Sequence, residues 1–324
     1  MRAIQIHEFG DPAAIEVHQV DAPGPPGKGQ VRIDVAGIGV GYFDGLLIRG
    51  DYQIRPELPF IPGSSLAGTV ESVGEGVEHL KPGMPVAAFA LNGAMAEQML
   101  LPAASCAPLP PDVDLESAAN FFISWATSLY GLREIGAVQP GETVLVLGAS
   151  GSTGTTAIEC AKALGARVIA AASTEAKREH CRAHGAAVTV DYTAGDWRDQ
   201  VKAATDGNGV DAVYDPVGGA LAEPALRLLV PGGRYLVVGF VTGIAKIPLN
   251  LPLLKRCSVH GVNWGGTVMA DPSVVPPVIG TLVEWTAAGE IDPAPAQVYA
   301  LEQAGEAFDA LFFRRSVGGI VIIP

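Results

Sequence analysis

The chain has 324 residues and a formal net charge of −13, from 21 Lys and Arg against 34 Asp and Glu. This acidic balance argues against nucleic acid or an anionic membrane as the main partner, so an anionic ligand must be held by local groups. The length suits about two domains. The hydrophobic share of 48% indicates a globular chain with a core.

Targeting and redox features point to the cytoplasm. The first residues, MRAIQIHEFG (1–10), alternate as a strand does and lack the apolar core of a signal peptide. No apolar stretch approaches the roughly 18 residues of a membrane span, so no membrane partner is expected. Four cysteines occur without a C-x-x-C pair, which suits free thiols in a reducing compartment: Cys106, Cys160, Cys181 and Cys257.

Short alternating runs broken by proline and glycine fill the first third of the chain. Residues 30–40, 66–74 and 84–90 are typical of strands, and residues 22–29 and 80–85 of turns. Many short strands with such breaks predict a compact β-rich domain.

The pattern changes to helical spacing over 114–136, with Asp114 as N-cap and Glu116 in the first turn. From Glu142 onward, apolar strands alternate with amphipathic helices, which predicts a doubly wound α/β fold with a covered parallel sheet. The tail at 316–324 is a further strand that could rejoin the first domain. The expected strands are 143–148, 167–172, 187–191, 211–217, 234–240 and 258–264, and the expected helices lie near 154–165, 175–184, 195–205 and 219–229.

A glycine loop follows the first of these strands in VLVLGASGSTG (144–154). Gly148 and Gly151 permit a sharp turn and close backbone approach, and Gly154 permits tight helix packing. The loop opens the helix at 155–166, whose free N–H groups and dipole form a natural seat for pyrophosphate. An ordinary glycine-rich turn is the alternative, but the surrounding strand–helix–strand pattern favours a dinucleotide site.

Two other glycine motifs are excluded. A P-loop needs a lysine at its end, and none lies between Glu142 and Lys162. A nucleophile elbow needs G-x-S-x-G, whereas Ser152 is the last residue of GASGS. Ser150 is therefore expected to be a loop hydroxyl or backbone donor.

The end of the second strand of this expected parallel sheet favours NADP over NAD. An NAD site usually has an acid there for the ribose 2′-hydroxyl, but the strand runs into Ser173, and Glu175 lies beyond it in the helix. Lys177 is a cation in a first helical turn, where the dipole disfavours it. A 2′-phosphate would explain it, with Ser173 and Tyr192 as further donors. A solvated surface lysine is the alternative.

The chain resembles the zinc-free quinone oxidoreductase branch of the medium-chain dehydrogenase/reductase superfamily, the relatives of zeta-crystallin, over essentially its whole length. The motifs that carry the resemblance are GYFDGLLIRGDYQ (41–53), LPFIPGSSLAGTVESVG (58–74), VQPGETVLVLGASGSTG (138–154), YDPVGG (214–219), PGGRYLVVGF (231–240) and VHGVNWG (259–265).

The resemblance implies a GroES-like β-rich catalytic domain over 1–121 and 265–324. A Rossmann domain that binds NADPH is inserted between these parts at 122–264, with the active site in the cleft. The resemblance also implies a homodimer through the last Rossmann strand, 258–264.

The family's cofactor contacts match three regions of this chain. The pyrophosphate positions are Gly151, Ser152 and Thr153, and the 2′-phosphate positions are Ser173, Lys177 and Tyr192. The positions near the nicotinamide are Thr127, Val217, Phe240, Val241 and Trp264.

Three positions depart from the family pattern. The usual asparagine before the aromatic residue of N-F-x-D is Gly41, and the usual glutamate of P-G-x-E is Ser65. A common lysine near the C-terminus is Gly319. Tyr42 and Tyr52 are retained as aromatic residues with hydroxyls. The three departures concern the substrate pocket and leave the cofactor loop unchanged.

A zinc site is not expected. A zinc dehydrogenase needs Cys and His ligands in its first domain, yet Cys106 is the only cysteine before Cys160. The histidines of that region fit no ligand motif: His7, His18 and His79.

One histidine pair, His180 and His184, lies one helical turn apart on one face. A metal could bridge the two, but no third ligand is evident. We expect solvated histidines on a surface helix.

Without a metal, hydroxyl donors would stabilise the negative oxygen that forms on hydride transfer, which nominates Tyr42, Tyr52 and Thr127 as catalytic residues. The alternative for the two tyrosines is aromatic packing without proton transfer. Quinones are electrophilic enough that positioning of two flat rings can supply most of the catalysis.

The sequence thus predicts an NADPH-dependent enzyme that transfers hydride to a quinone without zinc. The first alternative is an NADPH-dependent reductase of enoyl or alkenal substrates, which are α,β-unsaturated carbonyl compounds. The second is a non-catalytic NADPH-binding protein, which the departures at Gly41 and Ser65 keep open.

Overall fold

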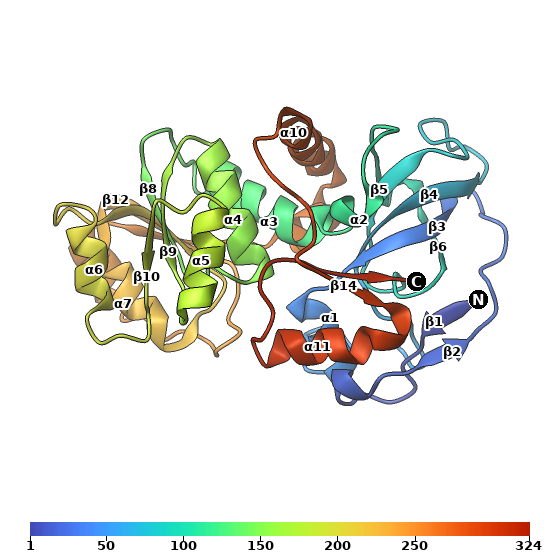
Figure 1. Cartoon of the computed structure of the whole chain (residues 1–324). Coiled ribbons are helices and arrows are strands. Elements are labelled where there is room, and N and C mark those ends of the chain that lie inside the picture. Colours follow the sequence, from blue (N-terminus) through green and yellow to red (C-terminus); the bar gives the residue numbers. More distant parts are fainter. The chain divides into compact units, whose positions relative to one another are not determined.

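The structure is a computed structural model that describes residues 1–324. The chain forms two compact units, which Figure 1 colours along the sequence. The first unit comprises Met1–Ser124, Ala270–Thr286 and Pro293–Pro324. The second comprises Trp125–Met269 and Ala287–Asp292.

A seven-stranded sheet forms the first unit, in the order β14-β15-β3-β4-β5-β7, with β6 also paired to β3. All pairs are antiparallel except β14 with β15. β15 pairs with β3, so the prediction that the C-terminal strand rejoins the first domain is confirmed. The strands are β3 (Gln30–Gly39), β4 (Ser65–Val73), β5 (Pro85–Phe89), β6 (Gln98–Pro102), β7 (Cys106–Pro108), β14 (Gln297–Ala300) and β15 (Ile320–Ile323), with a separate pair β1 (Arg2–Ile4) and β2 (Val17–Gln19).

The first unit also contains the helices α1 (Tyr42–Arg49), α2 (Leu115–Ala118), α11 (Ala304–Phe312) and most of α10 (Val275–Ala288). α1 and α11 lie side by side, as Figure 1 shows. A Cβ on Gly45 of α1 would lie 2.3 Å from the ring of Phe312. The two helices can therefore approach this closely only because residue 45 has no side chain.

The second unit contains a six-stranded parallel sheet in the order β10-β9-β8-β11-β12-β13. The order reverses at β8, from which the chain builds outward first on one side and then on the other. This is the doubly wound sheet that the alternation of strands and helices predicts. The strands are β8 (Thr143–Val146), β9 (Arg167–Ala171), β10 (Val188–Val190), β11 (Val210–Asp215), β12 (Leu229–Val237) and β13 (Ser258–Gly261).

In Figure 1 this sheet lies between α4 and α5 on one side and α6 and α7 on the other. The helices are α3 (Ala126–Leu129), α4 (Ser152–Ala163), α5 (Glu175–Ala183), α6 (Trp197–Ala203), α7 (Ala222–Leu226), α8 (Asn250–Lys255) and α9 (Trp264–Ala270). Short 3₁₀ turns lie at Pro12–Ala14, Ala103–Ser105, Gly219–Leu221, Pro272–Val274 and Leu301–Gln303. No single helix is long and apolar enough to cross a membrane.

The stretch 114–136, whose spacing is helical, forms several short helical segments. Asp114 caps α2 as expected, accepting a hydrogen bond from the N–H of Ser117 at 3.0 Å. Beyond it, π-helical stretches at Phe121–Trp125 and Tyr130–Ile135 flank the short α3. Each wide turn rotates the side chains that follow it, a change that a pattern of apolar spacing does not reveal.

Candidate cofactor and active site

The turn between β8 and α4 requires glycine at two positions. Gly148 has a φ of +55°, and a Cβ on it would lie 2.6 Å from Cγ2 of Val217. A Cβ on Gly154 would lie 2.4 Å from the carbonyl oxygen of Gly148. A Cβ on Gly151 would have its nearest neighbour at 3.5 Å, so this residue leaves the backbone open to approach. Ser150, between them, is buried.

α4 begins directly after this turn. Gly151 is its N-cap, its first turn contains no acidic residue, and its first side chains, Ser152 and Thr153, are half-buried. The first N–H groups of a helix have no carbonyl partner within it, and its dipole favours an anion at this end. The junction therefore fits a phosphate group, with a cradle that glycine keeps free of side chains.

The next two strands end beside each other at the same edge of the sheet. Ser173 follows β9 and Tyr192 follows β10, which are parallel neighbours, and both residues are half-buried. Lys177 lies in the first turn of α5, where its N–H donates to Oγ1 of Thr174 at 3.3 Å. The three predicted 2′-phosphate residues thus come from one edge of the sheet and the helix that starts there.

The first acid after β9 in the chain, Glu175, forms ion pairs along α5. Glu175 pairs with Arg182 and, at 2.9 Å, with Arg178, and hydrogen bonds from these two guanidinium groups lower the pKa of its carboxyl. Arg178 also contacts Asp191 at 3.0 Å and the carbonyl of Ala172 at 3.2 Å. The sequence analysis did not foresee that Arg178 pairs with Glu175 and Asp191 at this edge. Its position next to Lys177 in the chain was the one available signal.

The loops that follow β11 and β12 are bonded to each other. Oδ1 of Asp215 accepts hydrogen bonds from the N–H groups of Val217 at 2.8 Å and Gly218 at 2.9 Å, and the phenol of Tyr235 donates to Oδ2. Burial and the neighbouring carboxylate raise the pKa of Tyr235, which keeps the phenol a donor. The carbonyl of Val217 accepts from both the N–H and the hydroxyl of Thr242, each at 3.0 Å. Sequence reasoning missed Asp215, Tyr235 and Thr242.

The remaining predicted nicotinamide residues differ in exposure. Phe240 is 54% exposed and Val241 is half-buried, whereas Trp264 is nearly buried with its ring 5.3 Å from that of Tyr130. Trp264 begins α9 rather than ending the last strand, because β13 stops at Gly261. Thr127 is the only residue of α3 that is not fully buried, so its side chain can reach a ligand.

The two candidate tyrosines belong to the first unit and rest against different aromatic rings. Tyr42 begins α1, and its ring lies 4.7 Å from that of Phe312. Tyr52 meets Phe43 edge-on, with centroids 4.6 Å apart. Each of the two rings therefore has an aromatic neighbour within the first unit.

A buried carboxyl that the sequence analysis missed lies beside Tyr42. Asp44 is fully buried and accepts hydrogen bonds from the N–H of Gly41 at 2.8 Å and the hydroxyl of Ser64 at 2.7 Å. Burial raises the pKa of Asp44 to about 6, against the opposing effect of these hydrogen bonds. A carboxyl at the third position of a helix that reaches back to the cap is a recognisable pattern, and it could have been found.

The histidine pair on α5 is not solvated as predicted. His180 lies 2.9 Å from Oγ1 of Thr155, and His184 pairs through Nδ1 with the buried Glu159, so both rings face α4. Burial lowers the pKa of His180 to about 4. The other carboxylate oxygen of Glu159 accepts from the N–H of Asp292 at 2.6 Å. The prediction was wrong because the same spacing that aligns two histidines also places them on the packed face of a helix.

Cysteine and histidine side chains do not form a metal-ligand set. No three His, Cys, Asp or Glu side chains come close enough to hold a metal ion. Cys106 is the only cysteine of the first unit; it is buried, and this burial raises the pKa of its thiol to about 12.

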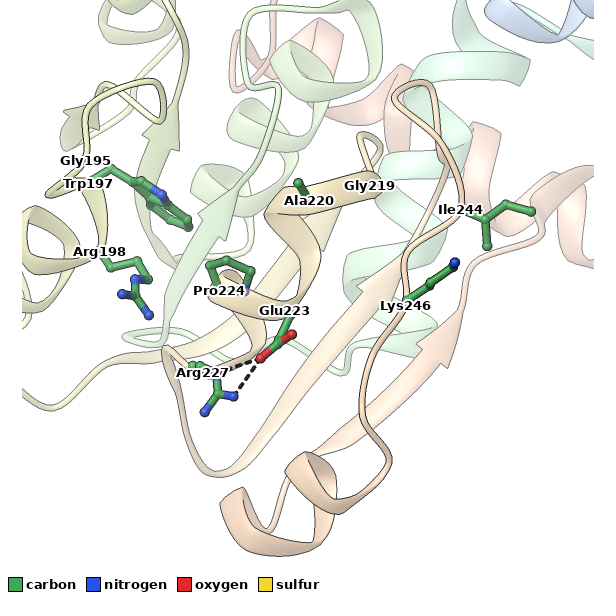
Figure 2. Close-up of a pocket in the computed structure, with 10 residues that line it drawn as sticks. All are labelled: Gly195, Trp197, Arg198, Gly219, Ala220, Glu223, Pro224, Arg227, Ile244 and Lys246. Carbon is green, nitrogen blue, oxygen red and sulfur yellow. Dashed lines mark hydrogen bonds and ion pairs between the residues drawn. The ribbon is translucent and has the colours of Figure 1, made fainter.

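A cavity of about 670 Å³ opens in the second unit, and Figure 2 shows the residues that line it. It lies between the start of α6, α7 and the loop after β12, and Glu223 pairs with Arg227 at 2.6 Å on its wall. The lining residues are Gly195, Trp197, Arg198, Gly219, Ala220, Glu223, Pro224, Arg227, Ile244 and Lys246. None of the predicted site residues is among them.

Comparison with known proteins places the chain in a family. The model of the alcohol dehydrogenase GroES-like domain matches residues 27–111, and that of the zinc-binding dehydrogenase matches residues 152–283. The chain is 36% identical to quinone oxidoreductase-like protein 2 of Rattus norvegicus over 323 residues, which cover 99% of this chain and 91% of that protein. The chain belongs to the medium-chain dehydrogenase/reductase superfamily.

Solved structures of medium-chain dehydrogenases/reductases resemble it over their whole length. The quinone oxidoreductase of Escherichia coli, complexed with NADPH, has a TM-score of 0.92 and 29% identity, and the match covers 100% of both chains. A 2-haloacrylate reductase has a TM-score of 0.86 and 29% identity, and the match covers 100% of this chain and 99% of that one. The chain is therefore a medium-chain dehydrogenase/reductase related to the quinone oxidoreductases, with a GroES-like domain and a Rossmann sheet.

Proposed function

We propose that this chain is an NADPH-dependent oxidoreductase that transfers hydride to a quinone without zinc. The observation that carries the proposal is the glycine turn into α4, where Gly148 and Gly154 keep side chains out of a helix N-terminus. The likeness to a quinone oxidoreductase complexed with NADPH supports the same cofactor.

The dinucleotide would lie along the carboxyl edge of the parallel sheet. The glycine turn and the first turn of α4 would hold the diphosphate, and the loops after β11 and β12 would hold the nicotinamide half, together with Thr127 on α3. The bound cofactor supplies the hydride. The residues assigned to it are Thr127, Gly148, Ser150, Gly151, Ser152, Thr153, Gly154, Ser173, Lys177, Tyr192, Val217, Phe240, Val241 and Trp264.

The preference for NADPH over NADH rests on charge at the end of β9. Glu175 would repel a 2′-phosphate and bind a 2′-hydroxyl, but two arginines hold its carboxylate along α5. Lys177 then supplies the positive charge, and Ser173 and Tyr192 supply hydrogen bonds.

Hydroxyl groups would stabilise the oxygen that gains charge in the acceptor. We assign this role to Thr127 and to the phenols of Tyr42 and Tyr52, whose rings are fixed by Phe312 and Phe43.

A second candidate is the reduction of an activated carbon–carbon double bond by the same site. The likeness to a 2-haloacrylate reductase favours it, because that name describes an α,β-unsaturated acid. Both acceptors receive hydride at an electron-poor carbon or oxygen, so only a comparison of acceptors separates them.

We also propose that two copies associate through β13. This strand is an edge of the parallel sheet and pairs only with β12, which leaves a row of backbone groups unpaired. Val259 on it is 44% exposed, and Leu249, Leu253 and Leu254, in or directly before α8, are 71–87% exposed. A second copy of the chain would cover this apolar surface. A cytoplasmic location stays a prediction.

The decisive experiment follows NADPH consumption by absorbance against quinones, enones, enals and simple aldehydes, with NADH in parallel. NADPH binding is first established by fluorescence titration. Quinone turnover with a strong NADPH preference is the expected result, and turnover of enones alone would favour the second candidate. Tight binding of NADPH without oxidation by any acceptor would overturn both reactions and leave the non-catalytic binding protein.

A further inference from the structure

Ser128 follows the proposed nicotinamide residue Thr127 in α3, and its side chain is fully buried. Its hydroxyl oxygen lies 2.7 Å from Oγ1 of Thr156, 3.0 Å from the phenol oxygen of Tyr214 and 3.1 Å from the carbonyl oxygen of Thr153. A hydroxyl has one proton to donate and two acceptor positions, so Ser128 can donate to either Thr156 or the carbonyl of Thr153 while it accepts from Tyr214.

The protons of this cluster can be assigned without leaving a donor unused. Oγ1 of Thr156 lies 3.1 Å from the carbonyl of Thr153 and donates to it. Ser128 then donates to Thr156, and the phenol of Tyr214 donates to Ser128. Burial raises the pKa of Tyr214, so its phenol keeps the proton that this arrangement needs. Buried polar groups satisfied in this way hold one arrangement of the elements that carry them.

Three elements meet at this one hydroxyl. Ser128 belongs to α3, Thr153 and Thr156 to the first turns of α4, and Tyr214 to β11. The packing around them has no spare room, since a Cβ on Gly131 would lie 3.0 Å from Val262 and 3.3 Å from the ring of Tyr214. A shift of α3 along α4 would therefore break hydrogen bonds and meet packed side chains.

We propose that Ser128 is a positioning residue that fixes Thr127 relative to the diphosphate-binding turn of α4. The inference rests on the proposed function, in which Thr127 lies at the nicotinamide and α4 at the diphosphate of the same molecule. The separation of these two points sets where the nicotinamide ring lies. A displacement of the ring lowers the rate of hydride transfer steeply but changes the total binding contacts little.

Ser128→Ala tests this directly. Thr156 keeps its bond to the carbonyl of Thr153, whereas the phenol of Tyr214 loses its acceptor. We expect kcat to fall about tenfold while the Kd for NADPH changes by less than about threefold. A shorter fluorescence lifetime of bound NADPH should accompany this, because a loosened nicotinamide ring loses excitation faster. The lifetime needs no acceptor, so it reads the position of the ring even where no turnover occurs.

Thr205→Ala is the matched control. Thr205 is a buried hydroxyl at the end of α6, which donates to the carbonyl of Val201 at 3.1 Å and accepts from the N–H of Gly209 at 3.0 Å. Loss of the Thr205 hydroxyl should lower the Tm about as much as loss of the Ser128 hydroxyl does. It should leave kcat and the fluorescence lifetime of bound NADPH unchanged. Tyr214→Phe removes only the phenol oxygen and should reproduce part of the Ser128→Ala effect, which provides a second variant if the first does not fold.

The proposal is overturned if Ser128→Ala and Tyr214→Phe leave both kcat and the lifetime as they are in the parent chain. It is also overturned if Kd rises as much as kcat falls, or if Thr205→Ala has the same effects. If the parent chain binds NADPH but oxidises it with no acceptor, the proposed reaction fails while the lifetimes still decide the role of Ser128. If the parent chain binds no NADPH, both proposals fail.

Discussion

The hydroxyl of Ser64 lies 2.7 Å from Oδ1 of Asp44, and both residues are fully buried in the first unit. The bond joins the start of α1 to the segment before β4. Hydrogen bonds to the carboxylate lower its pKa, yet burial outweighs them and raises the pKa of Asp44 to about 6. Asp44 therefore holds its proton more tightly in the folded chain than in the unfolded one.

Asp44→Asn should change how stability depends on pH. Between about pH 4 and 6 the unfolded chain releases this proton and the folded chain keeps it, so the contribution of Asp44 to the free energy of unfolding falls as pH rises. Because one pKa unit corresponds to about 1.4 kcal/mol, the loss is about 3 kcal/mol between pH 3 and pH 7. Urea unfolding of the parent chain and of Asp44→Asn at several pH values measures this loss. The difference between their free energies of unfolding should shrink as pH rises. The exposed control Asp112→Asn should give a constant difference, and a constant difference for Asp44→Asn as well would contradict the assignment.

Lys177→Ala should raise the KM for NADPH at least about tenfold and leave the KM for NADH nearly unchanged, because only NADPH carries the 2′-phosphate. Steady-state kinetics with both cofactors, or fluorescence titration where turnover is absent, measures the ratio. Lys202→Ala, which removes an exposed lysine paired with Asp199 on α6, is the control for net charge. Equal effects of Lys177→Ala on the two cofactors would show that Lys177 is only a surface residue.

Gly154→Ala should destabilise the second unit and weaken NADPH binding together. The added Cβ would lie 2.4 Å from the carbonyl oxygen of Gly148 and 2.7 Å from Cα of Ala149, both backbone atoms that cannot rotate away. Overpacking of this kind costs about 1–3 kcal/mol. Thermal unfolding and titration measure the two effects. Gly195→Ala is the control, because its added Cβ has no neighbour within 4 Å, and it should change neither stability nor NADPH binding. If both variants lose stability and binding equally, the close approach of residue 154 to the backbone is not the cause.

Val259→Lys should convert the proposed dimer into a monomer, since a charge on the β13 edge would be buried without a partner. Sedimentation velocity on the parent chain and the variant measures the mass. Val298→Lys provides a close match: Val298 is 46% exposed, against 44% for Val259, and lies on β14, the edge of the other sheet. A parent chain that sediments as a monomer would show that there is no dimer. A dimer that only Val298→Lys disrupts would show that the interface is not at β13.

The sequence predicted the features that repeat along the chain. Alternating strands and helices indicated the parallel sheet, and short runs broken by proline and glycine indicated the β-rich unit, because both patterns follow from which face of an element is buried. Gly148 and Gly154 were recognisable because a positive φ or a close approach restricts a position to one residue type.

The sequence missed what depends on partners far away in the chain. Ser128 looked like any helical serine until its neighbours from α4 and β11 were known. The solvation of His180 was predicted wrongly, since spacing along one helix does not show which helix covers it. The π-helical turns around Thr127 were missed for a related reason: they change the hydrogen-bond pattern without changing the residue types.

The bond from the N–H of Asp292 to Glu159 has a consequence for the integrity of the second unit. Residues 287–292 belong to this unit, although the chain on both sides of them belongs to the other. A fragment that stops at Met269 would contain all six parallel strands but would leave the buried Glu159 carboxylate with one donor fewer. An unmet buried acceptor destabilises a fold by about 1–3 kcal/mol. The smallest piece of the gene that encodes a self-sufficient Rossmann unit is therefore longer than the stretch that encodes its sheet, and the two units cannot be exchanged between proteins at a single junction.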